Sequence, residues 1–268
     1  MKQKLILGCI ADDFTGASDA ASFLVKGGLN TILYNGVPAA TQPLPEHTQA
    51  VVIALKTRMQ STPEAVAVSL EAINWLEQKG AEQFYVKYCS TFDSTPTGNI
   101  GPIVDAVMQR LQVQRTLLCP ALPANGRTVK DGILYVNGVP LADSPMRNHP
   151  LTPMWDSRIA ELMERQGRYR CFTASDQLMK RPAALQQELV RFQEMEPCFY
   201  IVPDFVQTED AELLVALFGD EKLLTGGSGL LESWARYLKE KQDRLHETKT
   251  GGERQLILAG SCSAMTLA

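Results

Sequence analysis

The fold is decided by LILGCIADDFTGA, the sequence of residues 5–17. Its first part, residues 5–11, is a continuous apolar run of the kind that forms a strand buried on both faces of a sheet. Small and apolar residues then recur at helical spacing over residues 15–27, and the pair Gly27-Gly28 ends the pattern. A buried strand that leads directly into a helix predicts the first unit of a parallel α/β sheet.

The same alternation continues along the chain. It predicts an α/β fold with a mainly parallel sheet flanked by helices on both faces. A last helix is predicted from the glycine-rich segment at 226–229 to about residue 245. The other predicted strands are residues 31–34, 51–55, 84–88, 116–119 and 198–202, and the other predicted helices are residues 62–79, 100–111, 156–165, 183–195 and 210–217.

The alternation is interrupted at residues 120–153, which are rich in proline. Two turn dipeptides, Asp131-Gly132 and Asn137-Gly138, flank the apolar residues 133–136, a spacing that predicts a small antiparallel excursion. A long irregular insertion in an α/β domain is more often a functional lid than a filler.

The end of the chain predicts a domain boundary. Residues 246–254 are polar and are interpreted as a linker, and residues 255–259 form a fresh apolar run that leads into Gly260-Ser261. We therefore expect a binding domain over residues 1–247. Residues 248–268 would be the linker and first strand of a second domain that this chain largely lacks.

Composition restricts the class of protein. The chain has 268 residues and a net charge of −4, which disfavours a nucleic-acid partner because phosphate neutralisation needs a basic face. The six cysteines form no Cys-x-x-Cys pair and are interpreted as reduced thiols of a cytoplasmic protein. No apolar run is long enough for a membrane span, and the N-terminal one is too short for a signal peptide. A homo-oligomer is left open.

Polar side chains cluster where the predicted strands end. In a parallel sheet the carboxyl ends of the strands lie at one edge, and ligands bind in the crevice outside them. Carboxylates, cations and hydroxyls at such an edge suit a small polyhydroxylated acid, with Arg and Lys for its carboxylate. The candidate residues are Asp12, Asp13, Lys56, Thr57, Arg58, Lys87, Ser90, Thr91, Asp93, Ser94 and Thr95, followed by residues 120–127.

These residues also have structural interpretations. Asp12 or Asp13 could cap the following helix, since Asp is favoured near helix N-termini, or act as general base on a substrate hydroxyl. With two aspartates in tandem, one can cap while the other faces a ligand. Lys87 could extend its ammonium to solvent or meet an anion. Arg127, in the turn-like Asn125-Gly126-Arg127, could be merely exposed or bind an anion.

The segment Gly226-Gly227-Ser228-Gly229 could hold an anion on free backbone N–H groups, although ordinary turn chemistry is the more frequent reason for such glycines. It lacks the Lys-Ser/Thr of a phosphate-binding loop. The histidines His47, His149 and His246 are scattered, so no metal-ligand spacing and no Ser-His-Asp arrangement is predicted.

Taken in order, the motifs of this chain resemble those of the four-carbon acid sugar kinase family, and in particular its 3-oxo-tetronate kinase branch. The resemblance covers the whole chain and is specific as a set. It is carried by Ala11-Asp12-Asp13-Phe14-Thr15-Gly16-Ala17, Lys56-Thr57-Arg58, the segment from Lys87 to Thr95, Gly98-Asn99-Ile100-Gly101, Pro120-Ala121-Leu122-Pro123 with Asn125-Gly126-Arg127-Thr128, Thr225-Gly226-Gly227-Ser228-Gly229 and Gly260-Ser261-Cys262-Ser263.

The resemblance implies transfer of the ATP γ-phosphate to the 4-hydroxyl of a four-carbon sugar acid, with ATP and Mg²⁺ as cofactors. Members of the family bind the sugar acid in the N-terminal domain and the nucleotide in the C-terminal domain. Asp12 would be the general base, with Asp13 as second choice. The substrate-binding residues would be Arg58, Lys87, Asp93, Ser94, Asn125 and Arg127, and the nucleotide-binding residues would be Gly227, Ser228, Gly229 and Ser261.

The resemblance is limited in one respect: the family continues well past the Gly-Ser-Cys-Ser turn, whereas this chain ends at Ala268. We therefore expect the chain to carry the acid-binding half, and its own activity stays open. Two alternatives are a non-catalytic sugar-acid-binding module and a D-threonate or D-erythronate kinase of the same family. A Rossmann-type dehydrogenase is disfavoured because no Gly-x-Gly-x-x-Gly follows the first strand.

Overall fold

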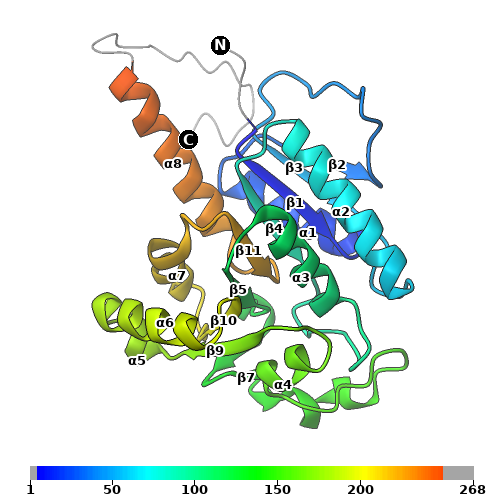
Figure 1. The fold of residues 1–268 in the computed structure, drawn as a ribbon, viewed down its shortest axis with the longest axis vertical. Coiled ribbons are helices and arrows are strands. Elements are labelled where there is room, and N and C mark those ends of the chain that lie inside the picture. The colour runs from blue at the N-terminus through cyan, green and yellow to red at the C-terminus, as the bar shows by residue number, and fades with distance from the viewer. Residues whose placement is uncertain (1–4, 250–268) are drawn as a thin grey trace, which may run out of the picture.

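The structure is a computed structural model and describes residues 5–249. A parallel sheet of eight strands forms its centre, in the order β2-β3-β1-β4-β11-β5-β10-β9 (Figure 1). The strands are β1 (Leu7–Ala11), β2 (Thr31–Asn35), β3 (Ala50–Ala54), β4 (Gln83–Lys87), β5 (Arg115–Cys119), β9 (Arg170–Ala174), β10 (Phe199–Pro203) and β11 (Leu223–Gly226). The predicted fold class is confirmed.

Helices cover both faces of the sheet. Near β1, helices α2 and α3 lie on one face, while α1 and α8 lie on the other and contact each other (Figure 1). The α-helices are α1 (Phe14–Lys26), α2 (Thr62–Gln78), α3 (Ile100–Leu111), α4 (Ile159–Glu164), α5 (Asp176–Met179), α6 (Pro182–Met195), α7 (Asp210–Phe218) and α8 (Leu231–Lys249).

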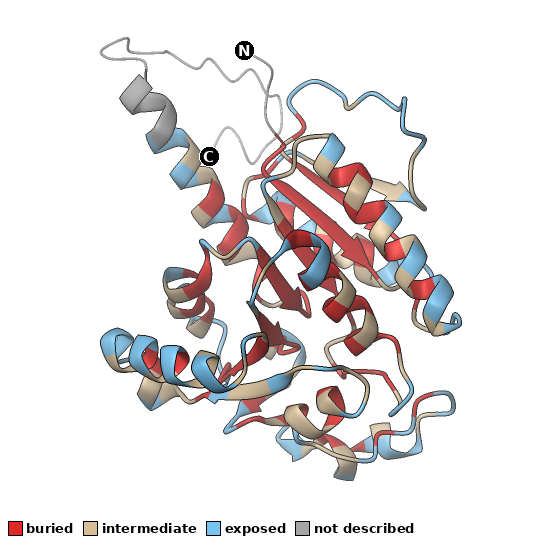
Figure 2. Ribbon diagram, in the orientation of Figure 1, coloured by how far each residue is buried: buried red, intermediate tan, exposed pale blue. Residues whose placement is uncertain are grey.

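The core is made by the strands. Every residue of β1 and β3 is buried, as Figure 2 shows in red. Helix α1 adds its face of Ala17, Ala20 and Leu24, and Gly8 of β1 lets α2 approach, because a Cβ there would lie 2.9 Å from Leu76. Burial of each large apolar side chain contributes roughly 1.5–3 kcal/mol to folding. Among the described residues, no helix is both long and apolar enough to span a membrane.

The predicted antiparallel excursion is confirmed. It consists of β6 (Arg127–Lys130), β7 (Ile133–Val136) and β8 (Val139–Pro140), joined by the two predicted turns. Asp131 and Asn137 have φ of 51°, and the glycines that follow them also have positive φ, which is the backbone of the type I′ hairpin turn.

Among the strands and α-helices of the described residues, three were not predicted: β9, α5 and β11. Strand β11 has only four residues and runs directly into the glycine-rich segment, so its apolar run is too short to stand out as a strand. It lies between β4 and β5 and therefore separates the loops that follow these two strands. Helix α8 begins at Leu231 rather than at residue 226.

The predicted linker is wrong at its beginning, because α8 extends to Lys249 and residues 246–249 are helical. The predicted strand at 255–259 and Ser261 lie outside the described residues. The division of the chain at residue 247 therefore stays a prediction.

Candidate functional site

A small pocket with a free volume of about 20 Å³ lies at the carboxyl ends of β1, β3 and β4. The helix after β1 and the helix after β4 cover opposite faces of the sheet, so the two neighbouring strands form a topological switch point, where open α/β sheets bind ligands. The pocket is lined by Ile10, Ala11, Asp12, Leu55, Thr57, Arg58, Ser69, Val86, Lys87, Tyr88, Asp93, Ser94, Asn99, Ile100 and Ile103.

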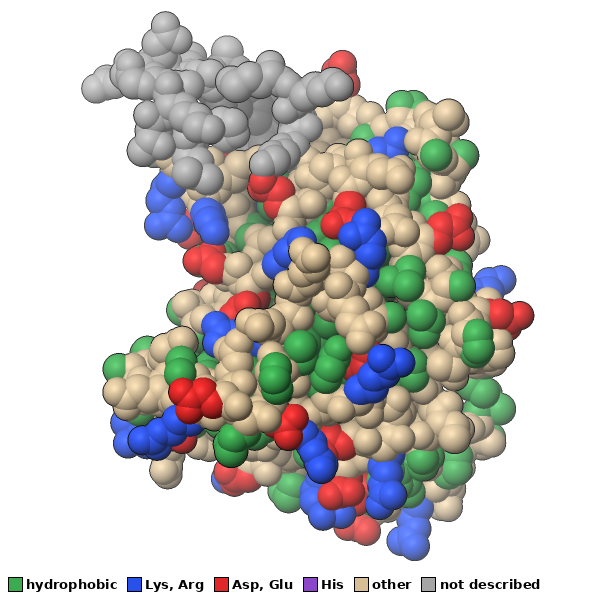
Figure 3. All heavy atoms as spheres, viewed as in Figure 1, with side chains coloured by type: hydrophobic (Ala, Val, Ile, Leu, Met, Phe, Trp, Pro, Cys, Tyr) green, Lys and Arg blue, Asp and Glu red, His purple; other side chains and the backbone are tan. Residues whose placement is uncertain are grey.

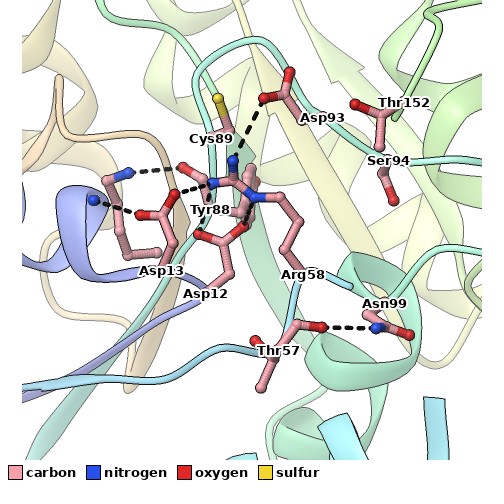
Figure 4. A network of polar contacts seen from close by, with 12 residues as sticks. Asp12, Asp13, Thr57, Arg58, Tyr88, Cys89, Asp93, Ser94, Asn99 and Thr152 are labelled. Carbon is pink, nitrogen blue, oxygen red and sulfur yellow. Dashed lines mark hydrogen bonds and ion pairs between the residues drawn. The ribbon is translucent and has the colours of Figure 1, made fainter. Parts of the chain in front are cut away.

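Arg58 connects three carboxylates at the polar side of this pocket (Figure 4). Its Nε lies 2.8 Å from Asp12 Oδ2 and its Nη2 lies 3.2 Å from Asp12 Oδ1, a bidentate pair. The same Nη2 lies 2.8 Å from Asp13 Oδ2, and Nη1 lies 3.5 Å from Asp93 Oδ2. The guanidinium fork fits such a set because it directs several N–H groups in fixed directions.

The surroundings of Asp12 determine whether its carboxylate can accept a proton. Burial raises its pKa above the ordinary value, while the hydrogen bonds and charge of Arg58 and the charge of Lys87 oppose that rise. For Arg58, the hydrogen bonds and charge of Asp12 raise the pKa despite burial, so the guanidinium stays charged. A buried carboxylate that has a raised pKa and is oriented by a fixed cation has the properties of a general base.

Asp13 has the helix-capping role that was expected for one of the two adjacent aspartates. It is the N-cap of α1, and its Oδ1 accepts a hydrogen bond from the Gly16 N–H at 2.5 Å. It is not among the residues that line the pocket. The structure thus separates the pair: Asp13 caps the helix and also contacts Arg58, whereas Asp12 faces the pocket.

Lys87, the last residue of β4, is only 5% exposed. Its Nζ donates to the Tyr88 carbonyl at 2.9 Å and forms no ion pair within the described part of the chain. A Cβ at Gly16 would lie 3.2 Å from this Nζ and 3.9 Å from Asp12 Oδ1, so the ammonium lies close to the carboxylate cluster. An ammonium has three donors, and a buried one with open donors beside a pocket is available to a ligand oxygen.

Asp93 and Ser94 belong to the loop after β4. Thr91 donates to Asp93 Oδ1 at 2.6 Å, and Ser94 Oγ donates to Gln166 Oε1 at 3.0 Å. Phe92, between Thr91 and Asp93, has φ of 51°. Its buried ring packs edge-on against Tyr88, which fixes this tight turn. The loop therefore presents both polar side chains to the pocket.

The proline-rich segment reaches this region through a residue that was not predicted. Thr152 is buried and belongs to the group of polar residues drawn around Asp93 and Ser94 in Figure 4. Its N–H and hydroxyl contact Nδ1 of His149 at 3.1 and 2.8 Å. The lid function of the segment stays a prediction.

Asn125 and Arg127 are not among the residues that line the pocket. The guanidinium of Arg127 donates to the Asn125 carbonyl, and its Nε is buried with no hydrogen-bond partner in the described structure. They follow β5, which lies two strand spacings from β4, roughly 9.6 Å, because β11 runs between the two strands. Their substrate role stays a prediction.

The glycine-rich segment lies beside the pocket strand, since Gly226 pairs with Lys87. Gly227 donates its N–H to the Cys119 carbonyl at 3.0 Å. A Cβ at Gly227 would lie 2.4 Å from the Pro120 carbonyl oxygen, and one at Gly229 would lie 2.5 Å from that of Ala121. The glycines are thus needed for close backbone packing, and the nucleotide-binding role of Gly227, Ser228 and Gly229 stays a prediction.

Ser228 donates its hydroxyl to Asp19 of α1, a contact that ties this segment to the helix after Asp13. Sequence reasoning missed Asp19, and it named Asn99 only as part of the motif Gly98-Asn99-Ile100-Gly101, not as a residue of the site. Within residues 5–249, no three His, Cys, Asp or Glu side chains come together as a metal-binding group. Acidic and basic side chains are interspersed on the face drawn in Figure 3.

Comparison with known proteins shows the family to which this chain belongs. Residues 7–234 match the family described as the sugar-binding N-terminal domain. A 3-oxo-tetronate kinase from Brucella melitensis is 46% identical over 265 residues, which are 97% of this chain and 60% of that protein. The chain thus spans about 60% of the length of this curated relative.

Solved structures agree with the match. A Haemophilus influenzae protein superposes with a TM-score of 0.82 at 45% identity, covering 87% of this chain and 56% of that one. A protein from Bordetella bronchiseptica, solved as a domain-swapped dimer with bound citrate, gives 0.73 at 26% identity, covering 90% of this chain and 59% of that one. The chain therefore belongs to the four-carbon acid sugar kinases, as the sugar-binding N-terminal domain of that family.

Proposed function

We propose that this chain is the acid-binding part of an ATP-dependent kinase that phosphorylates the 4-hydroxyl of a four-carbon sugar acid, 3-oxo-tetronate. The proposal rests on one observation. In the pocket, Arg58 orients the carboxylate of Asp12, and the nearby ammonium of Lys87 forms no ion pair with any described residue. The 46% identity to a 3-oxo-tetronate kinase supports the same substrate class.

Asp12 is assigned to the reacting hydroxyl. Its carboxylate would accept the proton of the hydroxyl that is to be phosphorylated, the role of a general base in phosphoryl transfer. The bidentate pair with Arg58 keeps both oxygens in a fixed orientation. Positioning of this kind supplies most of the protein's contribution to such reactions.

Lys87 is assigned to the acid end of the substrate. The sequence suggested both Arg58 and Lys87 as partners of the substrate carboxylate. Arg58 already faces three carboxylates, so its charge is neutralised within the protein. Lys87 has no such partner within 4 Å among the described residues, and its open donors suit a carboxylate or oxo oxygen.

ATP and Mg²⁺ belong to the proposal through the family. The carboxylates of the pocket are directed at Arg58, and the described residues bring no three His, Cys, Asp or Glu side chains together as a metal-binding group. We therefore assign the metal to parts of the protein beyond the described residues, and Gly227, Ser228 and Gly229 stay candidates for part of the nucleotide site. Here the described residues bind the acid and orient its hydroxyl.

The experiment is a calorimetric titration of the chain with the sodium salts of four-carbon sugar acids, with Asp12→Ala as the comparison. We expect 3-oxo-tetronate, D-erythronate or D-threonate to bind to the wild-type chain and more weakly to the variant. The citrate bound to the Bordetella relative makes citrate a useful competitor for an acid site. Failure of all these acids to bind at millimolar concentration would refute the assignment.

A further inference from the structure

Asn99 stands at the start of α3, yet its side chain does not cap that helix. Asn at this position usually accepts a hydrogen bond from the N–H groups of the first turn. Here the side chain is turned away, toward the loop that joins β3 to α2 (Figure 4). It is buried and lines the pocket.

The amide of Asn99 holds that loop at three points. Its Nδ2 donates to the Thr57 carbonyl at 2.7 Å and to the Gln60 carbonyl at 2.9 Å. Its Oδ1 accepts from the Thr62 hydroxyl at 2.8 Å. Both N–H groups and the oxygen are thus in use, and the two carbonyls fix which end of the amide is nitrogen.

The three contacts enclose Arg58 in the sequence, since they fall on residues 57, 60 and 62. Arg58 has few other constraints on its backbone: the loop leaves the sheet after Leu55, whose N–H donates to the Ala11 carbonyl. The position of the guanidinium among Asp12, Asp13 and Asp93 depends on where this loop lies.

We infer that Asn99 is a positioning residue that fixes Arg58, through the backbone of residues 57–60, in the geometry that orients the Asp12 carboxylate. The inference deepens the proposed function, and only the affinity measurements rest on that function. The effect of Asn99 on the position of Arg58 does not depend on which acid binds.

The matched variants are Asn99→Asp and Asn74→Asp, which make the same one-group change. Asn99→Asp places an acceptor against two carbonyl oxygens and removes both donors. Asn74 is half-buried on α2, and its oxygen already accepts from Arg110 Nε at 2.6 Å, so an acceptor is tolerated there. Thermal melts show whether each variant is folded.

The first readout is the Arg58 Nε–H signal in a proton–nitrogen correlation spectrum of labelled protein, identified by its absence in Arg58→Lys. We expect Asn99→Asp to shift or lose this signal and Asn74→Asp to leave it unchanged. An unchanged signal in folded Asn99→Asp would overturn the inference. If Asn99→Asp does not fold, Thr62→Val removes only the third contact, and we expect faster solvent exchange of the same N–H; unchanged exchange there would overturn it equally.

The second readout is the affinity for D-erythronate in wild-type and Arg58→Ala backgrounds. We expect Asn99→Asp to weaken binding in the first background and to have no further effect in the second, because Arg58 is then absent. Equal weakening in both backgrounds would show that Asn99 acts independently of Arg58 and refute the inference. If the wild-type chain binds no acid, the proposed function fails while the spectroscopic result still decides the role of Asn99.

Discussion

Arg58 and Asp12 form a bidentate ion pair across the carboxyl edge of the sheet, with Nε–Oδ2 and Nη2–Oδ1 distances of 2.8 and 3.2 Å. The two residues are 46 positions apart in the sequence, and each follows a different strand, β3 and β1. These neighbouring strands pair in parallel, and their register matches Ala11 with Ala54, so both chains leave the sheet at one level. The strand register therefore creates the pair.

Arg58→Lys tests the fork geometry. A lysine keeps the charge but cannot make two parallel hydrogen bonds to Asp12 and a third to Asp13. We expect acid affinity to fall about 10- to 100-fold, the equivalent of roughly 1.5–3 kcal/mol for hydrogen bonds to charged groups. The measurement is calorimetry with D-erythronate. Arg110→Lys is the control, since Arg110 pairs with Glu77 on an exposed helix face and should leave affinity unchanged.

Asp12→Asn tests whether the buried charge of Asp12 lowers the stability of the folded protein while it is needed for acid binding. Burial raises the pKa of Asp12, so the folded protein disfavours its charged form relative to the unfolded chain, and that cost is present at neutral pH. We expect the variant to lose acid binding and to unfold at a higher urea concentration than the wild type at pH 7.

The pH dependence gives the matching check on Asp12. As the pH falls through the raised pKa toward the ordinary value of 3.8, the wild-type carboxyl takes up a proton and its cost disappears. The stability difference between wild type and Asp12→Asn should therefore shrink over that range. A difference that grows with acid would contradict the assigned direction of the pKa shift.

Gly16→Ala tests the crowding between α1 and the site. The added Cβ would lie 2.8 Å from Asp13 Oδ1 and 3.2 Å from Lys87 Nζ, so the cap and the ammonium must both move. We expect weaker acid binding and a lower melting temperature, although alanine normally favours a helix interior by about 1 kcal/mol over glycine. Ser18→Ala in the same helix is the control, and a stabilised Gly16→Ala that binds normally would refute the crowding.

Gly227→Ala tests whether the glycine-rich segment is a packing element. Its Cβ would lie 2.4 Å from the Pro120 carbonyl oxygen, which belongs to the backbone and cannot rotate away. We expect a loss of about 1–3 kcal/mol in the free energy of unfolding, typical of overpacking. Gly36→Ala, where no atom lies within 4 Å, shows the effect of positive φ alone and should lose less. Equal losses would argue against close packing.

The sequence predicted most elements because the signals for them are local. Helix α3 occupies the predicted residues 100–111, and the turns at Asp131-Gly132 and Asn137-Gly138 were recognised from their residue types alone. Strand β9 was missed because it is half exposed, and its mixed pattern lacks the continuous apolar run of a buried strand. Its place at the edge of the sheet explains that exposure.

By itself, the sequence determined which residues follow the strands. Asp12, Arg58, Lys87 and Asp93 could be placed at one edge because a parallel sheet puts all carboxyl ends there. The tertiary structure alone decided which of them meet. Strand order depends on pairing between segments far apart in the chain, so only the fold shows that β11 separates Arg127 from the pocket strands and that Asn99 reaches the loop of Arg58.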